Sequence, residues 1–264
     1  MLVATSELVS ERTLTFAINV PHPDCAVWLL ESASAYDQPI ILQISERVLK
    51  TLGQPFIERL KRTIQGHRAT ASIHLDHCRD PALCKDAINW GASSVLFDGS
   101  RLPIGDNANH CIDVVRYAEK FNAVVEGECA PIPGDEDGIE GDEKPLVTPS
   151  LLKSFVEQTG VFMLAPFFGN IHGDYKDAGS SLNLNYLAQV RKTVGVPLVI
   201  HGGSGISRPV AQLIKDIGAG KLNISTDFKK ILSKLDTVSP ENRANQGHSL
   251  FASAFENLRE IWIK

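Results

Sequence analysis

The sequence predicts a (β/α)8 barrel, and two observations lead to that prediction. Eight short runs rich in Val, Ile and Leu alternate with amphipathic windows along the 264 residues, the pattern of buried parallel strands connected by helices. Polar side chains capable of chemistry follow these runs at the same end, where barrels of this type build their active sites. An open doubly wound sheet is the rival fold, and the placement of the polar residues favours the barrel.

Each predicted strand is a short apolar run bounded by Gly, Pro or polar residues. The windows between them, such as "DPALCKDAINWGA" (80–92) and "CIDVVRYAEKFN" (111–122), place apolar residues three and four positions apart, which is helical spacing. In chain order the predicted strands are residues 14–20, 39–45, 70–76, 92–98, 123–128, 161–167, 197–202 and 221–226.

No linker, repeat or low-complexity tract divides the chain, so we expect one barrel domain over residues 1–264, with a helical segment at about 240–264. Residues 129–145, "CAPIPGDEDGIEGDEKP", combine Gly, Pro and carboxylates without apolar periodicity. We expect a mobile loop there. Because it follows a strand that ends in carboxylates, a lid is favoured over a simple solvated loop.

Composition argues against several classes of protein. The formal charge of −5 and the absence of Lys- and Arg-rich runs argue against a nucleic-acid or anionic-membrane surface. No apolar run approaches ~18 residues, so no transmembrane helix is expected, and no signal-peptide pattern is seen. Five widely spaced cysteines without a C-x-x-C pair favour a reducing compartment. We therefore expect a soluble cytoplasmic protein.

Three histidines, His77, His172 and His201, leave different predicted strands at one end of the barrel. A single histidine at a strand end is usually a hydrogen-bonded structural residue. Three imidazoles that leave an open coordination position suit catalytic zinc, and a barrel would bring them together. We therefore expect a metal site at that end, which also receives Asp76, Asp98, Glu126, Glu128, Asn223, Ser225 and Thr226.

The segment "SIHLDHC" (72–78) contributes to this end in two ways. The two-residue period of a strand places His74 and Asp76 on one face and turns His77 to the other. We therefore assign His77 to the metal and Asp76 to proton transfer. His74 is expected to support the site from inside the barrel by hydrogen bonding.

Two loops predict a phosphate site. "HGGSG" (201–205) follows a buried strand and precedes a helix, so its backbone N–H groups can approach an anion. Barrels often bind phosphate with the loops after strands seven and eight, and "NIST" (223–226) occupies the second of these. A tight turn that requires glycine is the alternative for "GGSG". Lys176 in "HGDYK" is a candidate cation, although a lone lysine is usually a solvated surface residue.

A metal site, a phosphate site and carboxylates at one end of the barrel suggest a Lewis acid that stabilises an enediolate on a phosphorylated carbonyl compound. Such a reaction needs one group for a carbon-bound proton and another for a hydroxyl proton. Asp76 and a carboxylate from 129–145 are the candidates. A zinc hydrolase is an alternative that has no evident need for the phosphate loops, and a metabolite-binding protein without catalysis is another.

Together, the motifs "HLDHC", "FDGS", "VEGE…GDEDG", "FGNIHGDYK", "VIHGGSG" and "KLNISTD" resemble the class II, zinc-dependent fructose-bisphosphate aldolases and their tagatose-bisphosphate relatives. The matches come in family order and cover roughly residues 1 to 230. The resemblance implies a homodimeric or homotetrameric barrel that cleaves a ketose bisphosphate, a small-molecule sugar phosphate. The implied products are dihydroxyacetone phosphate and an aldehyde such as glyceraldehyde 3-phosphate.

The resemblance also implies roles for individual residues. His77, His172 and His201 match the zinc ligands, and Asp98 and Glu128 match acidic residues that hold a second or alternative divalent metal. Asp76 matches the residue that exchanges a proton with the aldehyde oxygen, and Glu136 matches the loop glutamate that takes a proton from dihydroxyacetone phosphate. Asn223 matches a contact to the bound triose. The phosphate cradle, where Na⁺ or K⁺ also binds in the family, corresponds to Gly173, Lys176, Gly202, Ser204 and Thr226.

Three departures from the family pattern bear on these expectations. The loop entry reads "CAPIPG" instead of a glycine-rich segment, and its prolines stiffen the path to Glu136. Ser225 stands where some members carry Asp or Asn. The C-terminal region lacks a "DPR" or "HPR" segment that supplies an arginine for the second phosphate, and Arg243 is the candidate substitute. The alternatives are therefore a tagatose-bisphosphate or ketose-1-phosphate aldolase, or a catalytically impaired triose-phosphate-binding relative.

Overall fold

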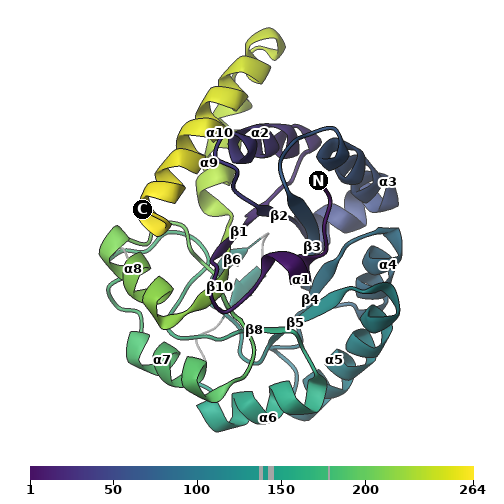
Figure 1. Ribbon diagram of the computed structural model, residues 1–264, viewed down its shortest axis with the longest axis vertical. Coiled ribbons are helices and arrows are strands. Elements are labelled where there is room, and N and C mark those ends of the chain that lie inside the picture. Colours follow the sequence, from purple (N-terminus) through teal and green to yellow (C-terminus); the bar gives the residue numbers. More distant parts are fainter. Residues whose placement is uncertain (137–138, 142–145, 178) are drawn as a thin grey trace.

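Eight parallel strands close into a barrel, which confirms the predicted fold (Figure 1). The computed structural model describes residues 1–136, 139–141, 146–177 and 179–264. Neighbouring strands follow the order β1-β10-β9-β8-β5-β4-β3-β2, so each strand pairs with the next barrel strand in the chain and the last pairs with the first. The barrel strands are β1 (Thr15–Asn19), β2 (Ile40–Ser45), β3 (Ala71–Cys78), β4 (Ser94–Phe97), β5 (Val124–Glu128), β8 (Met163–Ala165), β9 (Leu198–Ile200) and β10 (Ala219–Ile224).

The helices surround the barrel, and their ends follow local sequence signals. Asp80 caps one of them by accepting a hydrogen bond from the Ala82 N–H, with a proline in the first turn. The same helix ends at Gly91, which has a left-handed backbone with φ of 114°. The helices are α1 (Thr5–Leu8), α2 (Pro23–Ser34), α3 (Glu46–Gln65), α4 (Pro81–Trp90), α5 (Ile104–Ala118), α6 (Pro149–Thr159), α7 (Leu184–Thr193), α8 (Arg208–Ile217), α9 (Thr226–Leu235) and α10 (Pro240–Trp262), with a 3-10 turn at Glu119–Phe121.

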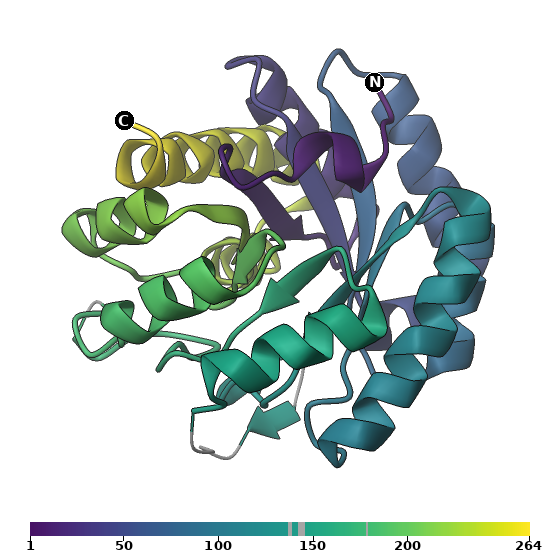
Figure 2. The same ribbon diagram turned by 60° about the horizontal axis from the view of Figure 1, so that its bottom comes forward.

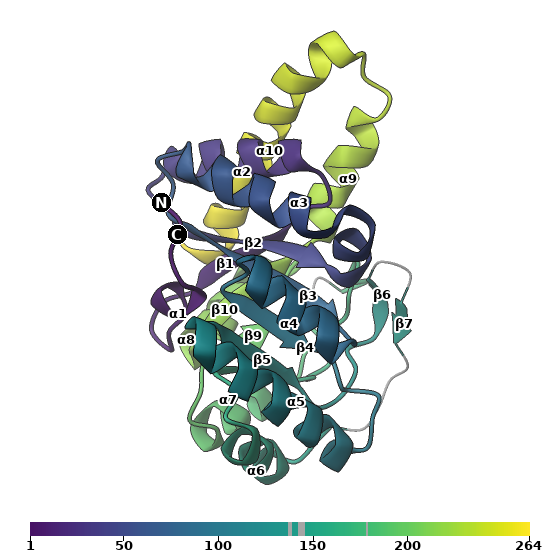
Figure 3. The same ribbon diagram turned by 90° about the vertical axis from the view of Figure 1, so that its right-hand side faces the viewer.

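The two ends of the barrel differ. Helix α1 lies across the amino ends of the strands (Figures 1 and 2), where Val9 joins a small apolar cluster with Ala17, Ile41, Met163 and Val199. The carboxyl ends face the opposite side, where the loops after the strands carry the predicted site residues. Figure 3 shows that α9 and the first half of α10 project away from the barrel. No helix in the described residues is long and apolar enough to cross a membrane.

The acidic stretch 129–145 contains regular structure that the sequence did not predict. Its described part forms an antiparallel pair, β6 (Gly134–Glu136) with β7 (Ile139–Gly141). The pair is attached to the barrel because the His172 N–H donates to the Pro133 carbonyl at 2.7 Å. Gly134 is required at this contact: its φ is 107°, and a Cβ there would lie 2.0 Å from the His172 carbonyl oxygen.

Candidate active site

The three predicted metal-ligand histidines converge at the carboxyl end of the barrel. One nitrogen from each of His77, His172 and His201 belongs to a set in which all atoms lie within 4.8 Å of one another. His77 Nε2 lies 2.9 Å from His201 Nδ1, and the ring centroids of His77 and His172 are 5.0 Å apart. Three imidazole nitrogens at this spacing match the donor set of catalytic zinc sites.

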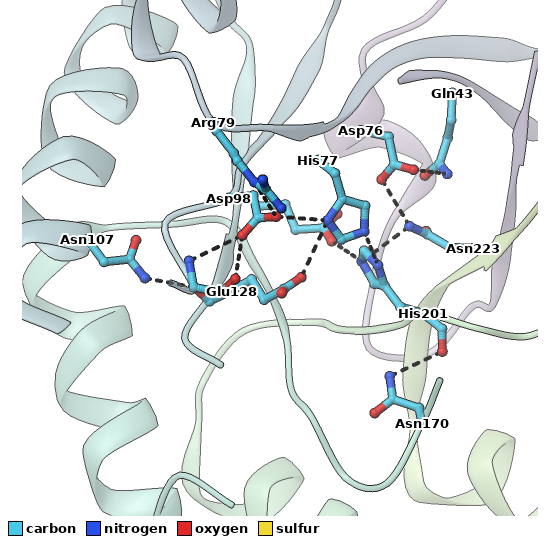
Figure 4. Close-up of polar contacts among 12 residues, drawn as sticks. Gln43, Asp76, His77, Arg79, Asp98, Asn107, Glu128, Asn170, His201 and Asn223 are labelled. Atoms are coloured by element: carbon cyan, nitrogen blue, oxygen red, sulfur yellow. Dashed lines mark hydrogen bonds and ion pairs between the residues drawn. The ribbon is translucent and has the colours of Figure 1, made fainter. Parts of the chain in front are cut away.

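The backbone of His77 is bent in a way that directs its side chain into the site. The strand period alone would send His77 away from the interior that Asp76 faces. His77 instead has a φ of 46°, and the register between β3 and β4 shifts between Leu75 and Cys78. A left-handed backbone costs a non-glycine residue about 1–3 kcal/mol and persists where the surrounding structure holds it. In Figure 4 the side chain of Asp76 points toward Asn223 and that of His77 toward His201, so both take part in the same cluster.

The other two histidines are held by contacts between loops. Asn170 is fully buried; its Oδ1 accepts from the Phe168 N–H and its Nδ2 donates to the His201 carbonyl at 3.2 Å. This side chain joins the segment of His172 to that of His201. No role is predicted for Asn170 from the sequence pattern, although its position in "GNIHG", two residues before His172, places it beside a predicted ligand.

Asp98 and Glu128 form a second potential cation site with His77, whose Nδ1 lies 3.3 Å from Asp98 Oδ2 and 3.8 Å from Glu128 Oε2. One ligand atom from each residue falls within the same 4.8 Å limit. Glu128 Oε2 is buried and accepts no hydrogen bond from the described residues. An orphaned buried carboxylate oxygen beside an imidazole and a second carboxylate fits a divalent cation.

The two carboxyl groups of this site have opposite pKa shifts. Burial alone would raise the pKa of Asp98, but the hydrogen bond and charge of His77, with hydrogen bonds from Ser100, lower it below its usual range. Burial and repulsion from Asp98 raise the pKa of Glu128 well above its usual range. Perturbed pairs of this kind are concentrated at functional sites.

Asp76 lies beside the histidines with its carboxylate among amides (Figure 4). Its Oδ1 accepts from Asn223 Nδ2 at 3.2 Å. Its Oδ2 accepts from Gln43 Nε2 at 3.2 Å and Asn19 Nδ2 at 3.4 Å. Asn223 Nδ2 is also 3.2 Å from His201 Nε2, so this amide lies between Asp76 and a predicted metal ligand. Neutral donors stabilise the ionised carboxylate without neutralising it.

The predicted phosphate loops also lie at this end of the barrel. Gly202 has φ of 68°, and a Cβ there would lie 1.9 Å from the Ile171 carbonyl oxygen. Ser204 Oγ accepts from the Asp227 N–H at 3.4 Å, which joins "HGGSG" to the first turn of α9. Thr226 is the first residue of α9, and the buried Oγ of Ser225 has no partner in the described residues. An unpaired hydroxyl at a helix start fits an anion.

The remaining predicted residues are less closely connected. Lys176 is exposed in a turn, and Gly173, with φ of 112°, has open space on its Cβ side. The backbone of Glu136 lies in β6, and its side chain is outside what the structure describes. Arg243 donates to the Leu235 carbonyl and to Asp236, at the opposite end of α9 from Thr226.

Two buried charged residues that sequence analysis left without a role contact the site from below. Glu126 Oε1 accepts from His201 Nε2 at 2.7 Å, and Oε2 accepts from Lys221 Nζ at 2.8 Å. Burial alone would raise the pKa of Glu126, but Lys221 and the hydrogen bond with His201 lower it below its usual range. The two-residue period of a strand places Lys221 inside the barrel together with Asn223, so the sequence could have indicated that Lys221 is buried there.

Comparison with known proteins agrees with this geometry. The family model described as "Fructose-bisphosphate aldolase class-II" matches residues 7–262. The chain belongs to the class II fructose-bisphosphate aldolase family. It is therefore a class II aldolase, a family whose members use zinc and act on sugar phosphates, and the histidine cluster is compatible with that metal.

Individual relatives carry different names within the class II aldolases. The chain is 30% identical over 251 residues to the fructose-bisphosphate aldolase of Geobacillus stearothermophilus, covering 90% of this chain and 87% of the relative. It is 35% identical over 203 residues to the 6-phospho-5-dehydro-2-deoxy-D-gluconate aldolase of Shouchella clausii, covering 75% and 69%. A crystal structure of a putative fructose-1,6-biphosphate aldolase from Coccidioides immitis shares the fold, with a TM-score of 0.87, 22% identity and coverage of 95% and 91%.

Proposed function

We propose that this protein is a zinc-dependent aldolase that reversibly cleaves fructose 1,6-bisphosphate into dihydroxyacetone phosphate and glyceraldehyde 3-phosphate. The observation that carries the proposal is the convergence of His77, His172 and His201 next to Asp76. A ketose cleavage site needs a Lewis acid at the carbonyl and a base at the hydroxyl two carbons away. In this barrel Asn223 lies between the two groups, with its Nδ2 3.2 Å from Asp76 Oδ1 and 3.2 Å from His201 Nε2.

Zinc held by the three histidines would polarise the C2 carbonyl and stabilise negative charge on its oxygen. In the cleavage direction, Asp76 takes the proton of the C4 hydroxyl. The C3–C4 bond then breaks: the hydroxyl oxygen becomes the aldehyde oxygen, and the electrons of the broken bond give an enediolate of the triose phosphate. The carboxylate of Asp76 suits this step because its contacts to Asn19, Gln43 and Asn223 orient it.

The enediolate must then receive a proton at C3 to give dihydroxyacetone phosphate. We assign this proton to Glu136, which lies on the antiparallel pair attached to the His172 segment. Asn223 is assigned to the hydroxyls of the triose. Gly173, Lys176, Gly202, Ser204 and Thr226 are assigned to its phosphate, where a monovalent cation is also expected.

The second phosphate of the substrate needs a cation on the aldehyde side of Asp76, and Arg243 lies at the wrong end of α9 to supply it within one chain. A small hollow at the carboxyl ends of β1 and β2 offers an alternative. Lys229 of α9 lines it together with Asn19 and Ser45, and Asn19 itself contacts Asp76. We assign the Lys229 ammonium, which lies at this hollow beside Asn19, as the cation for the aldehyde-side phosphate.

Substrate comparison tests the proposal. The zinc-loaded protein is assayed with fructose 1,6-bisphosphate, tagatose 1,6-bisphosphate, fructose 1-phosphate and 6-phospho-5-dehydro-2-deoxy-D-gluconate. We expect the highest kcat/KM with fructose 1,6-bisphosphate. A higher value for another ketose phosphate would assign that substrate instead, and triose-phosphate binding without turnover of any of them would indicate a non-catalytic relative.

A further inference from the structure

Lys221 and Glu126 form an ion pair at the centre of the barrel, and both residues are 0% exposed. Removing two charges from water costs several kcal/mol per ion, so a buried pair is weak evidence for stability. A barrel interior can be filled with apolar side chains at no such cost. Stability alone therefore does not explain why this ion pair is present.

The two oxygens of Glu126 divide their contacts between Lys221 and the site. Oε2 accepts from Lys221 Nζ at 2.8 Å, and Oε1 lies 2.7 Å from His201 Nε2. Asn223 Nδ2 is farther from the same nitrogen, at 3.2 Å. Because an ionised carboxylate can only accept, the shorter contact requires His201 to carry its proton on Nε2. The lone pair of His201 is then on Nδ1.

This Nδ1 is the atom that faces the other ligands, 2.9 Å from His77 Nε2. Metal-ligating histidines commonly donate their other N–H to a carboxylate, which fixes the tautomer and makes the ligand nitrogen more basic. Glu126 occupies that position for His201. Lys221 keeps Glu126 an acceptor, because an ammonium can only donate.

Contacts on the other side fix Lys221 in turn. Its Nζ lies 3.3 Å from His74 Nε2, which must therefore accept, and His74 Nδ1 then donates to Ser94 Oγ at 2.7 Å. Ser94 Oγ is 2.8 Å from Thr5 Oγ1 of α1. The expected hydrogen bonding of His74 inside the barrel is thus present, and it runs from the amino-end helix to the site.

We propose that Glu126 and Lys221 are positioning residues that present His201 to the metal through Nδ1. The inference rests on the proposed zinc site. It predicts that the pair sets the tautomer of His201 in the metal-free protein and the affinity of the loaded site, whereas a purely structural pair would set stability alone.

The test uses Glu126→Gln, Lys221→Met and the double variant, with Lys85→Met as the matched control because Lys85 pairs with Asp113 at the surface. A glutamine offers both a donor and an acceptor, so either tautomer of His201 can be satisfied. Nitrogen-15 NMR of the labelled histidines in metal-free protein, assigned with His201→Gln, should show the Nε2–H form in the wild type and a mixture in Glu126→Gln. A wild type that is not in the Nε2–H form would overturn the proposal.

Zinc affinity, measured by competition with a chromophoric chelator, provides the second readout. We expect about 10–100-fold weaker binding for Glu126→Gln and Lys221→Met, as for other partners of metal ligands, and no change for Lys85→Met. The double variant removes both buried charges, so its metal-free melting temperature should return toward wild type while its zinc affinity stays at least about tenfold weaker.

Zinc affinity of the double variant within about twofold of wild type would show a structural pair and overturn the proposal. If either single variant does not fold, the zinc affinity of the double variant alone distinguishes a positioning role from a structural one. A wild type that binds no zinc would instead contradict the proposed function, and the tautomer measurement in the metal-free protein keeps the two failures apart.

Discussion

The residues inside the barrel next to the site are polar or charged, whereas those between the strands and the surrounding helices are apolar. The layer between strands and helices is apolar, with buried rings such as Phe16, Phe97 and Phe155. The space enclosed by the strands, by contrast, holds the side chains of His74, Glu126 and Lys221, each of which is completely buried. Apolar burial stabilises by about 25 cal/mol per Å², whereas buried charges seldom do. The comparison indicates that the outer layer supplies stability and the interior supplies chemistry.

Strand β5 shows the division within three residues. Glu126 and Glu128 face the site, whereas Gly127 between them faces outward, where a Cβ would lie 2.8 Å from the Phe155 ring. We expect substitutions on the inner face to affect function and substitutions on the outer face to affect stability.

The largest expected effect is loss of the metal. His172→Ala removes one of three imidazoles, so zinc affinity and cleavage should be lost together while the melting temperature of the metal-free protein changes little. Zinc content by elemental analysis and a coupled aldolase assay measure this. His248→Ala is the control, because that exposed histidine pairs with Glu31 far from the site; an active, zinc-free His172→Ala protein would contradict the assignment.

The next effect separates proton transfer from metal binding. Asp76→Ala should retain zinc and lose about 10²–10⁴-fold in kcat, the usual contribution of a general acid-base group. Zinc content and steady-state rates are compared on the same preparation. An Asp76→Ala protein that remains fully active would remove Asp76 from the mechanism.

A substitution in the outer layer should have the opposite signature. Phe155→Ala deletes a buried ring beside β5 and should lower the free energy of unfolding by about 3–5 kcal/mol, measured by denaturant titration, with zinc affinity of the folded protein unchanged. Phe121→Ala is the control, because Phe121 is 49% exposed and its loss should cost little. Weakened zinc binding by folded Phe155→Ala protein would show that the outer layer also contributes to the metal site.

The smallest effect concerns the rim, where interior and outer layer meet. Lys229→Met should raise KM for fructose 1,6-bisphosphate about 10-fold or more, since a hydrogen bond to a charged group contributes about 1.5–3 kcal/mol, and leave KM for fructose 1-phosphate unchanged. Lys230→Met is the control, because Lys230 pairs with Asp174. An equal change for both substrates would exclude Lys229 from the aldehyde-side phosphate.

Much of the fold and of the candidate site was predictable from the periodicity of apolar residues. The eight barrel strands and the convergence of His77, His172 and His201 follow from apolar runs and from residues placed at their ends. The pairing of Glu126 with Lys221 did not follow, because it depends on which interior positions of β5 and β10 lie at the same height. The β6–β7 pair was also missed: the composition of 129–145 indicates a loop, and the contact between Gly134 and His172 that attaches β6 to the barrel cannot be read from composition.

We propose that cleavage depends on zinc held by three histidines, His77 near the end of β3 and His172 and His201 in the segments after β8 and β9. The most direct test measures the initial rate of fructose 1,6-bisphosphate cleavage by the wild-type protein before chelation, after exhaustive chelation and after one equivalent of zinc is restored. We expect activity to disappear with the metal and to return with it. Full activity in the metal-free protein would contradict it.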